Sequence, residues 1–266
     1  MLLKPSSLLL VSRNTSARNV LVAHNPICKG RLYSRSSSES MIDRATPRSH
    51  HDLPSFLEHA ERVDLPTSSP TYVGTHFEYT ALHTLSRYGL SLSRVGGRDD
   101  QGIDLIGTWK LPPPFDERTL KVFLQCKVLV KRCGPNLIRE LEGAFAGAPA
   151  AWKGRSTLGC LVASTLPTAS LRGAMHRCKM PMMFLSIQKD SGIVRAWNWN
   201  WAAREAGLVG LEATTRFGTT RDLDGSELQE SEVVLAHERE VILPHGQLLG
   251  MEGLDLVGPA TQNDTS

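Results

Sequence analysis

Hydrophobic residues recur with helical spacing in "GTHFEYTALHTLSRYG", residues 74–89. Side chains three and four positions apart lie on one face of a helix, so this spacing predicts an amphipathic helix that packs one face against a core. Gly89 marks a plausible end for the helix. The predicted buried stripe consists of Phe77, Ala81, Leu82, Leu85 and Tyr88.

The pattern then changes to alternation and to short apolar runs, which are typical of strands. A loop with three consecutive prolines, residues 111–118, separates the second predicted strand from the third. Strands are predicted at 90–95, 103–109, 120–130, 158–165 and 182–187, and helices from near Pro135, at 168–179, and after Trp201 as far as Gly207. A helix, a three-stranded meander and then helix, strand, helix, strand is the order of a three-layer α/β fold.

Charge divides the chain into three segments. Residues 1–50 carry eight Lys and Arg against two acids, residues 51–218 carry 20 against 15, and residues 219–266 carry two against ten. The basic, Ser-rich start predicts a mitochondrial presequence over residues 1–33, with cleavage after Tyr33 at "RLYS" and an ordinary basic terminus as the alternative.

The rest of the chain falls into three predicted parts. Residues 34–70 are expected to be a flexible linker with a short helix at Phe56–Val63, and residues 71–218 form the folded domain. Residues 219–266 are expected to be an acidic, largely mobile tail that could bind a protein partner, with "EVVLAHEREVIL" as an isolated β-element. No apolar run is long enough for a transmembrane helix, and the five cysteines lack zinc spacing, which favours reduced thiols.

Polar residues interrupt the third predicted strand, "LKVFLQCKVLV", on one of its faces. Because strand side chains alternate, Gln125 and Lys127 project together, and pairing with the preceding strand can bring Asp104 beside Gln125. Glu78 on the first helix could complete the group. Carboxylate, amide and carbonyl oxygens suit Mg²⁺ or Mn²⁺, and a lysine suits an attacked phosphate, so the pattern indicates phosphodiester hydrolysis.

Glu78, "DDQGIDL" (99–105) and "LQCK" (124–127) together resemble the Glu, Asp and Gln-x-Lys site of Mrr-type restriction endonucleases, a branch of the PD-(D/E)xK superfamily. "IRELEGAFA" (138–146) and "LVASTLPTASLRGAM" (161–175) resemble the helix and the strand-to-helix step that follow that site. The resemblance covers about residues 72–187 and implies a restriction-endonuclease-like α/β/α core around a central mixed sheet.

The basic start and "VRAWNWNWAAREAGLVGLEATTRFG" (194–218) further resemble a fungal mitochondrial family named for being required for respiratory growth, protein seven. That resemblance implies a matrix protein that supports respiration through mitochondrial DNA.

By the nuclease resemblance, the catalytic residues would be Glu78, Asp104, Gln125 and Lys127, with Mg²⁺ or Mn²⁺ held by Asp104, Gln125, Glu78 and the backbone carbonyl of Cys126. Nucleic-acid contacts would come from Arg98, Lys131 and Arg132. Gln125 stands where an acidic ligand is commoner, so two carboxylates rather than three face the metal.

Each member of this pattern also has a structural interpretation. Thr75 and Glu78 could form a capping box, Lys127 could be an ordinary strand lysine, and the Trp residues of "WNWNW" more readily pack than stack on bases. Three functions remain open: a Mg²⁺-dependent endodeoxyribonuclease, a non-catalytic nucleic-acid-binding descendant of the nuclease fold, and a respiratory assembly factor. The oligomeric state is not specified by the sequence.

Overall fold

The computed structural model describes residues 50–95, 102–115, 119–148, 152–154, 156–221 and 227–244. Its centre is a mixed six-stranded sheet in which the strands follow one another in sequence order. The first three strands are antiparallel, the third to fifth are parallel, and the sixth returns antiparallel. The strands are β1 (Leu90–Arg94), β2 (Leu105–Lys110), β3 (Thr119–Lys127), β4 (Thr157–Ala163), β5 (Met182–Ile187) and β6 (Val194–Trp199).

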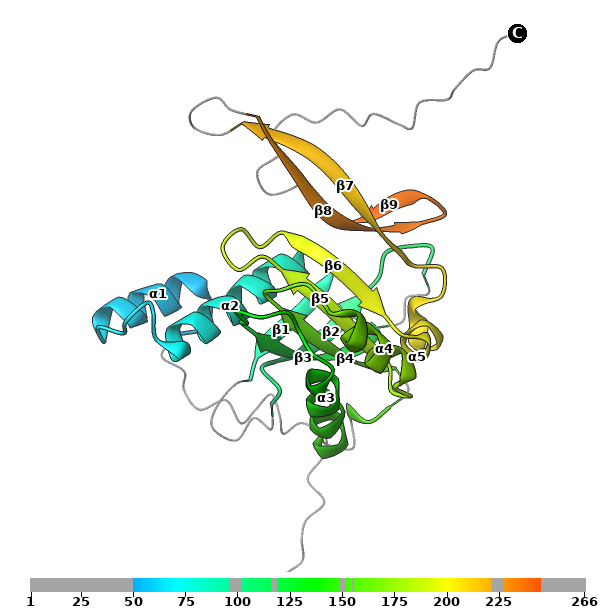
Figure 1. The fold of residues 1–266 in the computed structure, drawn as a ribbon, viewed down its shortest axis with the longest axis horizontal. Coiled ribbons are helices and arrows are strands. Elements are labelled where there is room, and N and C mark those ends of the chain that lie inside the picture. Colours follow the sequence, from blue (N-terminus) through cyan, green and yellow to red (C-terminus); the bar gives the residue numbers. More distant parts are fainter. Residues whose placement is uncertain are drawn as a thin grey trace, which may run out of the picture. The chain divides into compact units, whose positions relative to one another are not determined.

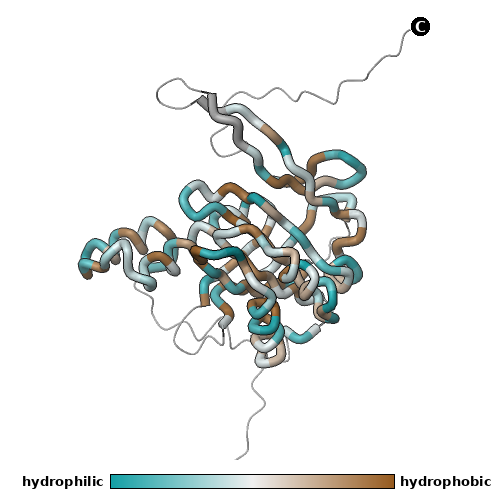
Figure 2. The backbone as a smooth tube through the Cα atoms, in the orientation of Figure 1, coloured by the Kyte–Doolittle hydropathy of each residue, from teal (hydrophilic) through white to brown (hydrophobic). Residues whose placement is uncertain are grey.

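Helices cover both faces of this sheet (Figure 1). The helix α2 (Pro70–Ser86) packs its predicted stripe against one face, while α3 (Asn136–Gly147) and α4 (Ala169–Arg177) pack against the other. Figure 2 shows hydrophobic segments in the strands and in the helices, interspersed with hydrophilic ones. The predicted three-layer α/β fold with a central mixed sheet is therefore confirmed.

Side-chain alternation along β3 divides the core as the sequence predicted. Val122 and Leu124 join the α2 side of the core, and Phe123 joins the side of α3 and α4. The strand ends at Lys127, earlier than predicted, and Val130 is fully exposed beyond it. Trp197 of β6 is buried against Tyr88 and Trp109, which confirms packing as its role.

A second sheet contains three strands, β7 (Glu212–Arg221), β8 (Glu227–His237) and β9 (Glu240–Leu243), and it contacts the first sheet through β8 and β6. Val233, Leu235 and Leu243 belong to the same hydrophobic core as α2. The boundary predicted at residue 218 is therefore wrong for residues 227–243. The four consecutive apolar residues of "EVVLAH", Val233 to Ala236, are all buried, so this segment folds with the domain and is not an isolated element. The chain from residue 245 to 266 lies outside the described residues.

Between the two sheets the chain forms α5 (Trp201–Ala203) and one turn of π-helix, η2 (Arg204–Leu208). Asn200 caps α5 and is almost fully buried, with 1% exposed. Its amide oxygen accepts from the backbone N–H groups of Met182 and Ala203. Its amide nitrogen donates to the carbonyls of Met175, in the last turn of α4, and of Cys178 and Met180, which follow that helix. One side chain thus joins β5, α4 and α5.

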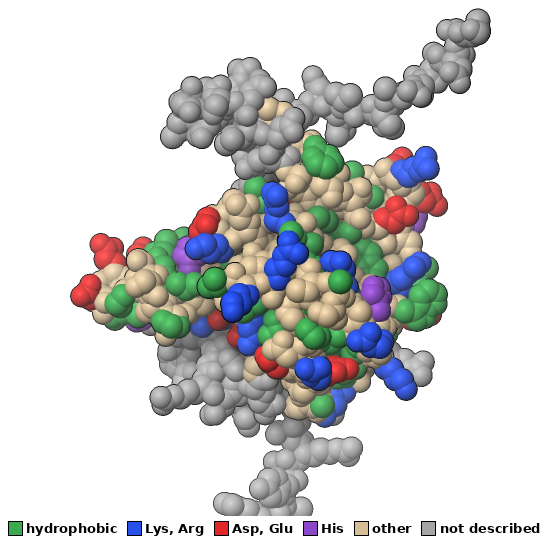
Figure 3. All heavy atoms as spheres, in the orientation of Figure 1, with side chains coloured by type: hydrophobic (Ala, Val, Ile, Leu, Met, Phe, Trp, Pro, Cys, Tyr) green, Lys and Arg blue, Asp and Glu red, His purple; other side chains and the backbone are tan. Residues whose placement is uncertain are grey.

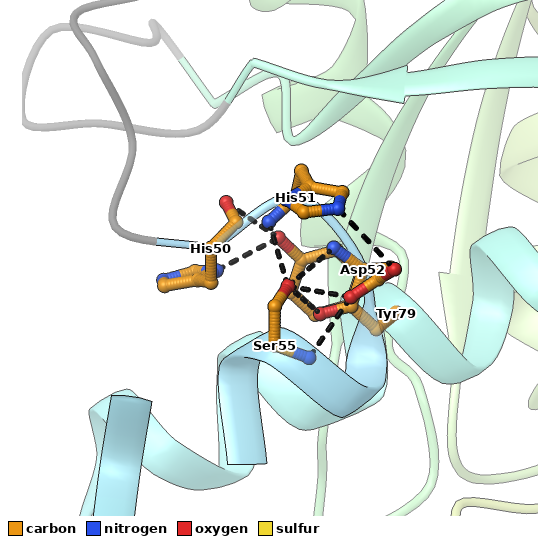
Figure 4. Close-up of polar contacts among 5 residues, drawn as sticks. All are labelled: His50, His51, Asp52, Ser55 and Tyr79. Carbon is orange, nitrogen blue, oxygen red and sulfur yellow. Dashed lines mark hydrogen bonds and ion pairs between the residues drawn. The ribbon is translucent and has the colours of Figure 1, made fainter. Parts of the chain in front are cut away.

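The short helix predicted at Phe56–Val63 is present, inside the segment otherwise predicted as a flexible linker. The helix α1 (Leu53–Arg62) starts at a capping box made by Asp52 and Ser55, and it buries Phe56 and Ala60. His50 Nδ1 lies 2.8 Å from the hydroxyl oxygen of Tyr79 on α2, as Figure 4 shows. The linker prediction is therefore wrong from residue 50 onward, because these contacts attach α1 to α2.

Four cysteines lie in the described chain, and all four are free thiols that are buried or partly buried, as predicted. Within the described residues, no helix is both long and apolar enough to cross a membrane. The predicted presequence, residues 1–33, and Cys28 lie outside the described residues.

Candidate functional site

The ends of β2 and β3 bring Asp104 and Gln125 together. Leu105 pairs with Leu124, so the next position of this antiparallel register places Asp104 opposite Gln125, as the sequence predicted. The backbone N–H of Asp104 donates to the carbonyl of Leu124 at 2.9 Å. In the other direction, the Cys126 N–H donates to Asp104 Oδ2 at 2.6 Å. The Asp104 carboxylate is therefore held at the carboxyl end of β3 by a short, charge-assisted hydrogen bond.

Gln125 is a buried polar residue with an unsatisfied acceptor. Only 5% of the residue is exposed, and its Oε1 atom has no hydrogen-bond partner among the described residues. Gly102 lies close to this amide, because a Cβ at Gly102 would lie 3.0 Å from Gln125 Nε2. Gly102 also has a φ of +81°, which favours glycine at this position. A buried oxygen without a donor is rare in native proteins and calls for an explanation.

Glu78 lies on α2 and forms an ion pair with Arg94, the last residue of β1. Arg94 Nη2 also donates to Thr75 Oγ1 at 3.4 Å. The alternative of a capping box between Thr75 and Glu78 is wrong, since α2 begins at Pro70 and is capped by the Ser69 side chain. Glu78 therefore lies well inside the helix, where its carboxylate faces the sheet.

The thiol of Cys126, at the end of β3, lies in an environment that disfavours its ionisation. Its pKa is raised well above the ordinary value, first by burial and then by the negative charges of Asp104 and Glu78. Arg94 opposes the shift. Of these groups, Asp104 contacts Cys126 directly, through the hydrogen bond from the Cys126 N–H to Asp104 Oδ2.

Lys127 projects to the other side of the sheet from Cys126, toward α3. Its Nζ atom lies 3.7 Å from Glu140 Oε2, and the two side chains are 33% and 46% exposed. Asn136 Nδ2 donates to the second oxygen of Glu140 at 3.3 Å. An ion pair this exposed stabilises the fold by at most about 1 kcal/mol, so Lys127 can exchange Glu140 for another anion at little cost.

The predicted site residues are thus distributed around one strand end. Asp104, Gln125 and Cys126 are adjacent there, Glu78 approaches from α2, and Lys127 extends toward α3. Lys131 and Arg132 are exposed in the loop that follows, whereas Arg98, Asp99 and Asp100 lie outside the described residues. In the part of the chain that the structure describes, no three His, Cys, Asp or Glu residues are grouped so as to hold a metal ion.

The sequence interpretation missed Arg94 and Glu140, the two residues that pair with the predicted site. Arg94 belongs to the predicted strand "LSLSRV", which follows the predicted helix of Glu78, but the sequence does not show that the two side chains meet. Glu140 occupies the exposed face of α3, where an acid has no distinguishing feature in one sequence.

The fold and the site define an α/β domain with a central mixed sheet, in which acidic, amide and basic side chains surround the end of β3. Residues 69–118 and 114–217 match the model of the family described as Required for respiratory growth protein 7. These segments make up more than half of the chain, which therefore belongs to this family.

Individual relatives are similar over parts of their length. An uncharacterized mitochondrial protein of Schizosaccharomyces pombe is 36% identical over 46% of this chain, and the match spans 49% of that relative. The protein named Required for respiratory growth protein 7, mitochondrial, is 26% identical in Candida glabrata and 23% identical in Zygosaccharomyces rouxii. Those two matches span 53% of this chain and 72% and 73% of the relatives.

Among solved structures, MspJI restriction endonuclease in complex with a 27-mer oligonucleotide aligns with 57% of this chain and 32% of its own, at 14% identity and a TM-score of 0.31. A similarity of this size gives no basis for assigning a function.

Proposed function

We propose that this protein is a mitochondrial matrix nuclease that hydrolyses phosphodiester bonds in mitochondrial DNA with the help of Mg²⁺ or Mn²⁺. The observation that carries the proposal is the buried, unsatisfied Oε1 of Gln125 opposite the Asp104 carboxylate. An amide oxygen beside a carboxylate oxygen is a donor set that hard divalent cations prefer. The relatives named mitochondrial support the location, and the basic start of the chain supports import.

Each residue has a role in this proposal. Asp104, Gln125 and the backbone carbonyl of Cys126 would hold the metal ion, and Glu78 would add a second carboxylate. When bound, the ion would supply charge to the attacked phosphate and acidity to a bound water. Lys127 would leave Glu140 and place its ammonium against the phosphate, where it stabilises the negative charge that develops during attack.

A second candidate is a nucleic-acid-binding protein that has the fold without the cleavage reaction. The specific observation in its favour is that Glu78 is already paired with Arg94 and Lys127 with Glu140. A carboxylate neutralised by arginine is a weaker metal ligand, because the cation must displace the guanidinium.

The deciding experiment compares metal-dependent cleavage of plasmid and single-stranded DNA by wild type, Lys127→Ala and Asp104→Asn. Both variants are expected to lose about 10²- to 10³-fold in rate. Lys189→Ala is the matched control, since Lys189 is 57% exposed and pairs with its neighbour Asp190. Its cleavage should equal that of wild type.

DNA binding is measured beside cleavage, over a range of salt concentrations. Lys127→Ala should bind nearly as well as wild type, because backbone affinity is spread over several cations. Equal cleavage by all the variants would refute the proposed site. Salt-dependent binding by a wild type that never cleaves would establish the second candidate.

A further inference from the structure

Two loops leave the sheet side by side at the carboxyl ends of β3 and β4. They comprise residues 128–134 and 164–168, here called the paired loops. Cys133 and Pro167 form a parallel β-bridge, and the N–H of Thr168 donates to the Cys133 carbonyl at 3.3 Å. The N–H of Ser164 donates to the Lys127 carbonyl at 3.1 Å, so the paired loops begin directly at the candidate lysine.

Hydroxyl groups of the second loop hold the backbone of the first. Ser164 Oγ accepts from the N–H of Leu129 at 2.9 Å, and Thr165 Oγ1 donates to the carbonyl of Lys131 at 3.2 Å. Thr168 Oγ1 donates to the carbonyl of Cys133 at 2.7 Å. Three alternate residues of a surface loop are therefore fixed by hydrogen bonds, each with a net stabilisation of about 0.5–1.5 kcal/mol. Surface loops are usually more mobile than the elements they connect.

The exposed side chains of the paired loops are apolar and cationic. Val130 is fully exposed at 101%, Leu166 is 46% exposed, and Lys131 and Arg132 are exposed beside Val130. Cys133, by contrast, is fully buried and anchors the loop to the α3 side of the core. A single exposed aliphatic residue needs no explanation. Here two exposed aliphatic side chains lie on loops that hydrogen bonds join, next to Lys131 and Arg132 and close to Lys127. This combination indicates a contact surface.

We propose that the paired loops bind nucleic acid at an unpaired or unstacked step, which deepens the proposed function and rests on it. Lys131 and Arg132 would contact backbone phosphates, which carry the complementary charge. Val130 and Leu166, the apolar side chains beside these cations, would pack on the face of a base. An aliphatic side chain makes no hydrogen bond to a base edge and contributes by apolar packing, and an unstacked step exposes a base face for such packing. On the face drawn in Figure 3, Lys and Arg side chains are spread out rather than gathered in one block.

The test measures binding without metal, in EDTA, so that cleavage cannot intervene. The probes are a fluorescent single-stranded oligonucleotide, a fully paired duplex and the same duplex with a bulge. Val130→Ser is compared with Val63→Ser, because Val63 is an exposed valine (51%) at the end of α1, away from the paired loops. Val130→Ser should weaken binding to the single strand and the bulge about three- to tenfold, as burial of part of one aliphatic side chain implies, and leave the paired duplex unchanged.

The double variant Lys131→Ala, Arg132→Ala tests the phosphate contacts. Loss of two contacts should reduce the slope of log affinity against log salt by about 1.4 for the single strand. Thermal unfolding should show that all variants fold like wild type, since none of these side chains is buried.

The outcomes separate this inference from the proposed function. If Val130→Ser and Val63→Ser bind every probe equally, the paired loops are not the contact surface, and the proposed function stands. If the wild type binds none of the probes at any salt concentration, both the proposed function and this inference are refuted.

Discussion

Replacing the buried amide of Gln125 should stabilise the metal-free protein while removing its response to metal. An acceptor buried without a donor costs about 1–3 kcal/mol, and Gln125→Leu removes that cost. The difference in shape between glutamine and leucine reduces this gain by up to about 1.5 kcal/mol. The expected gain is on the order of 1 kcal/mol in the free energy of unfolding, or about 2–4 °C in Tm for a domain of this size.

The assay is urea unfolding in EDTA and again with Mn²⁺ or Mg²⁺. Gln188→Leu is the control, because Gln188 is exposed after β5 and its replacement should change the free energy of unfolding by less than about 0.5 kcal/mol. With metal at a hundred times its Kd, wild type should gain about 2.7 kcal/mol, and Gln125→Leu should gain much less.

Two results would refute this reasoning. A loss of stability in Gln125→Leu without metal would mean that the amide oxygen already accepts a hydrogen bond. That oxygen would then not be available to bind a metal ion. An equal metal response in wild type and Gln125→Leu would place any metal at another site.

Three further predictions concern other parts of the chain. Asn200→Ala should lower the free energy of unfolding by at least about 3 kcal/mol in chemical denaturation, because several buried backbone groups lose their partner at once, whereas a loss under 1 kcal/mol would contradict the connecting role. Burial raises the pKa of Glu232, so its contribution to the free energy of unfolding is fully present below the unfolded pKa near 4.5 and is lost as pH rises through the folded pKa. The free energy of unfolding, measured against pH, should show this fall in wild type and not in Glu232→Gln. N-terminal sequencing of the organellar protein should begin at Ser34 or a few residues later, and recovery of Met1 would exclude cleavage.

Periodicity predicted the layers because burial and secondary structure share the same repeat. The α2 stripe packs on one face of the sheet, and the alternation of β3 sends Val122 and Leu124 to that face and Phe123 to the other. The same reasoning placed Asp104 opposite Gln125, since a hairpin across residues 111–118 permits few registers.

Charged pairs escaped prediction because they depend on contacts between distant segments. Nothing in the spacing of residues 78 and 94 gives the distance between the end of β1 and the middle of α2. The segment 227–243 was misjudged for a related reason: its acids outweigh its bases, which suggested a solvated tail. In fact Glu232 is buried between Arg87 and Tyr88, while Val233 and Leu235 fill the core. The average charge of the segment therefore concealed four consecutive apolar residues, Val233 to Ala236, that are all buried.

The choice between the two candidate functions depends on the ion pair of Glu78 and Arg94. Their side chains are 13% and 16% exposed, and removal of one member of a buried pair typically costs about 3–5 kcal/mol because the other charge is left uncompensated. In a nuclease, a divalent cation would compensate Glu78, and the displaced Arg94 would need a new anion, which a bound phosphate supplies. Metal and nucleic acid should then bind cooperatively. In a protein that only binds nucleic acid, the pair stays closed and the two affinities should be independent of each other.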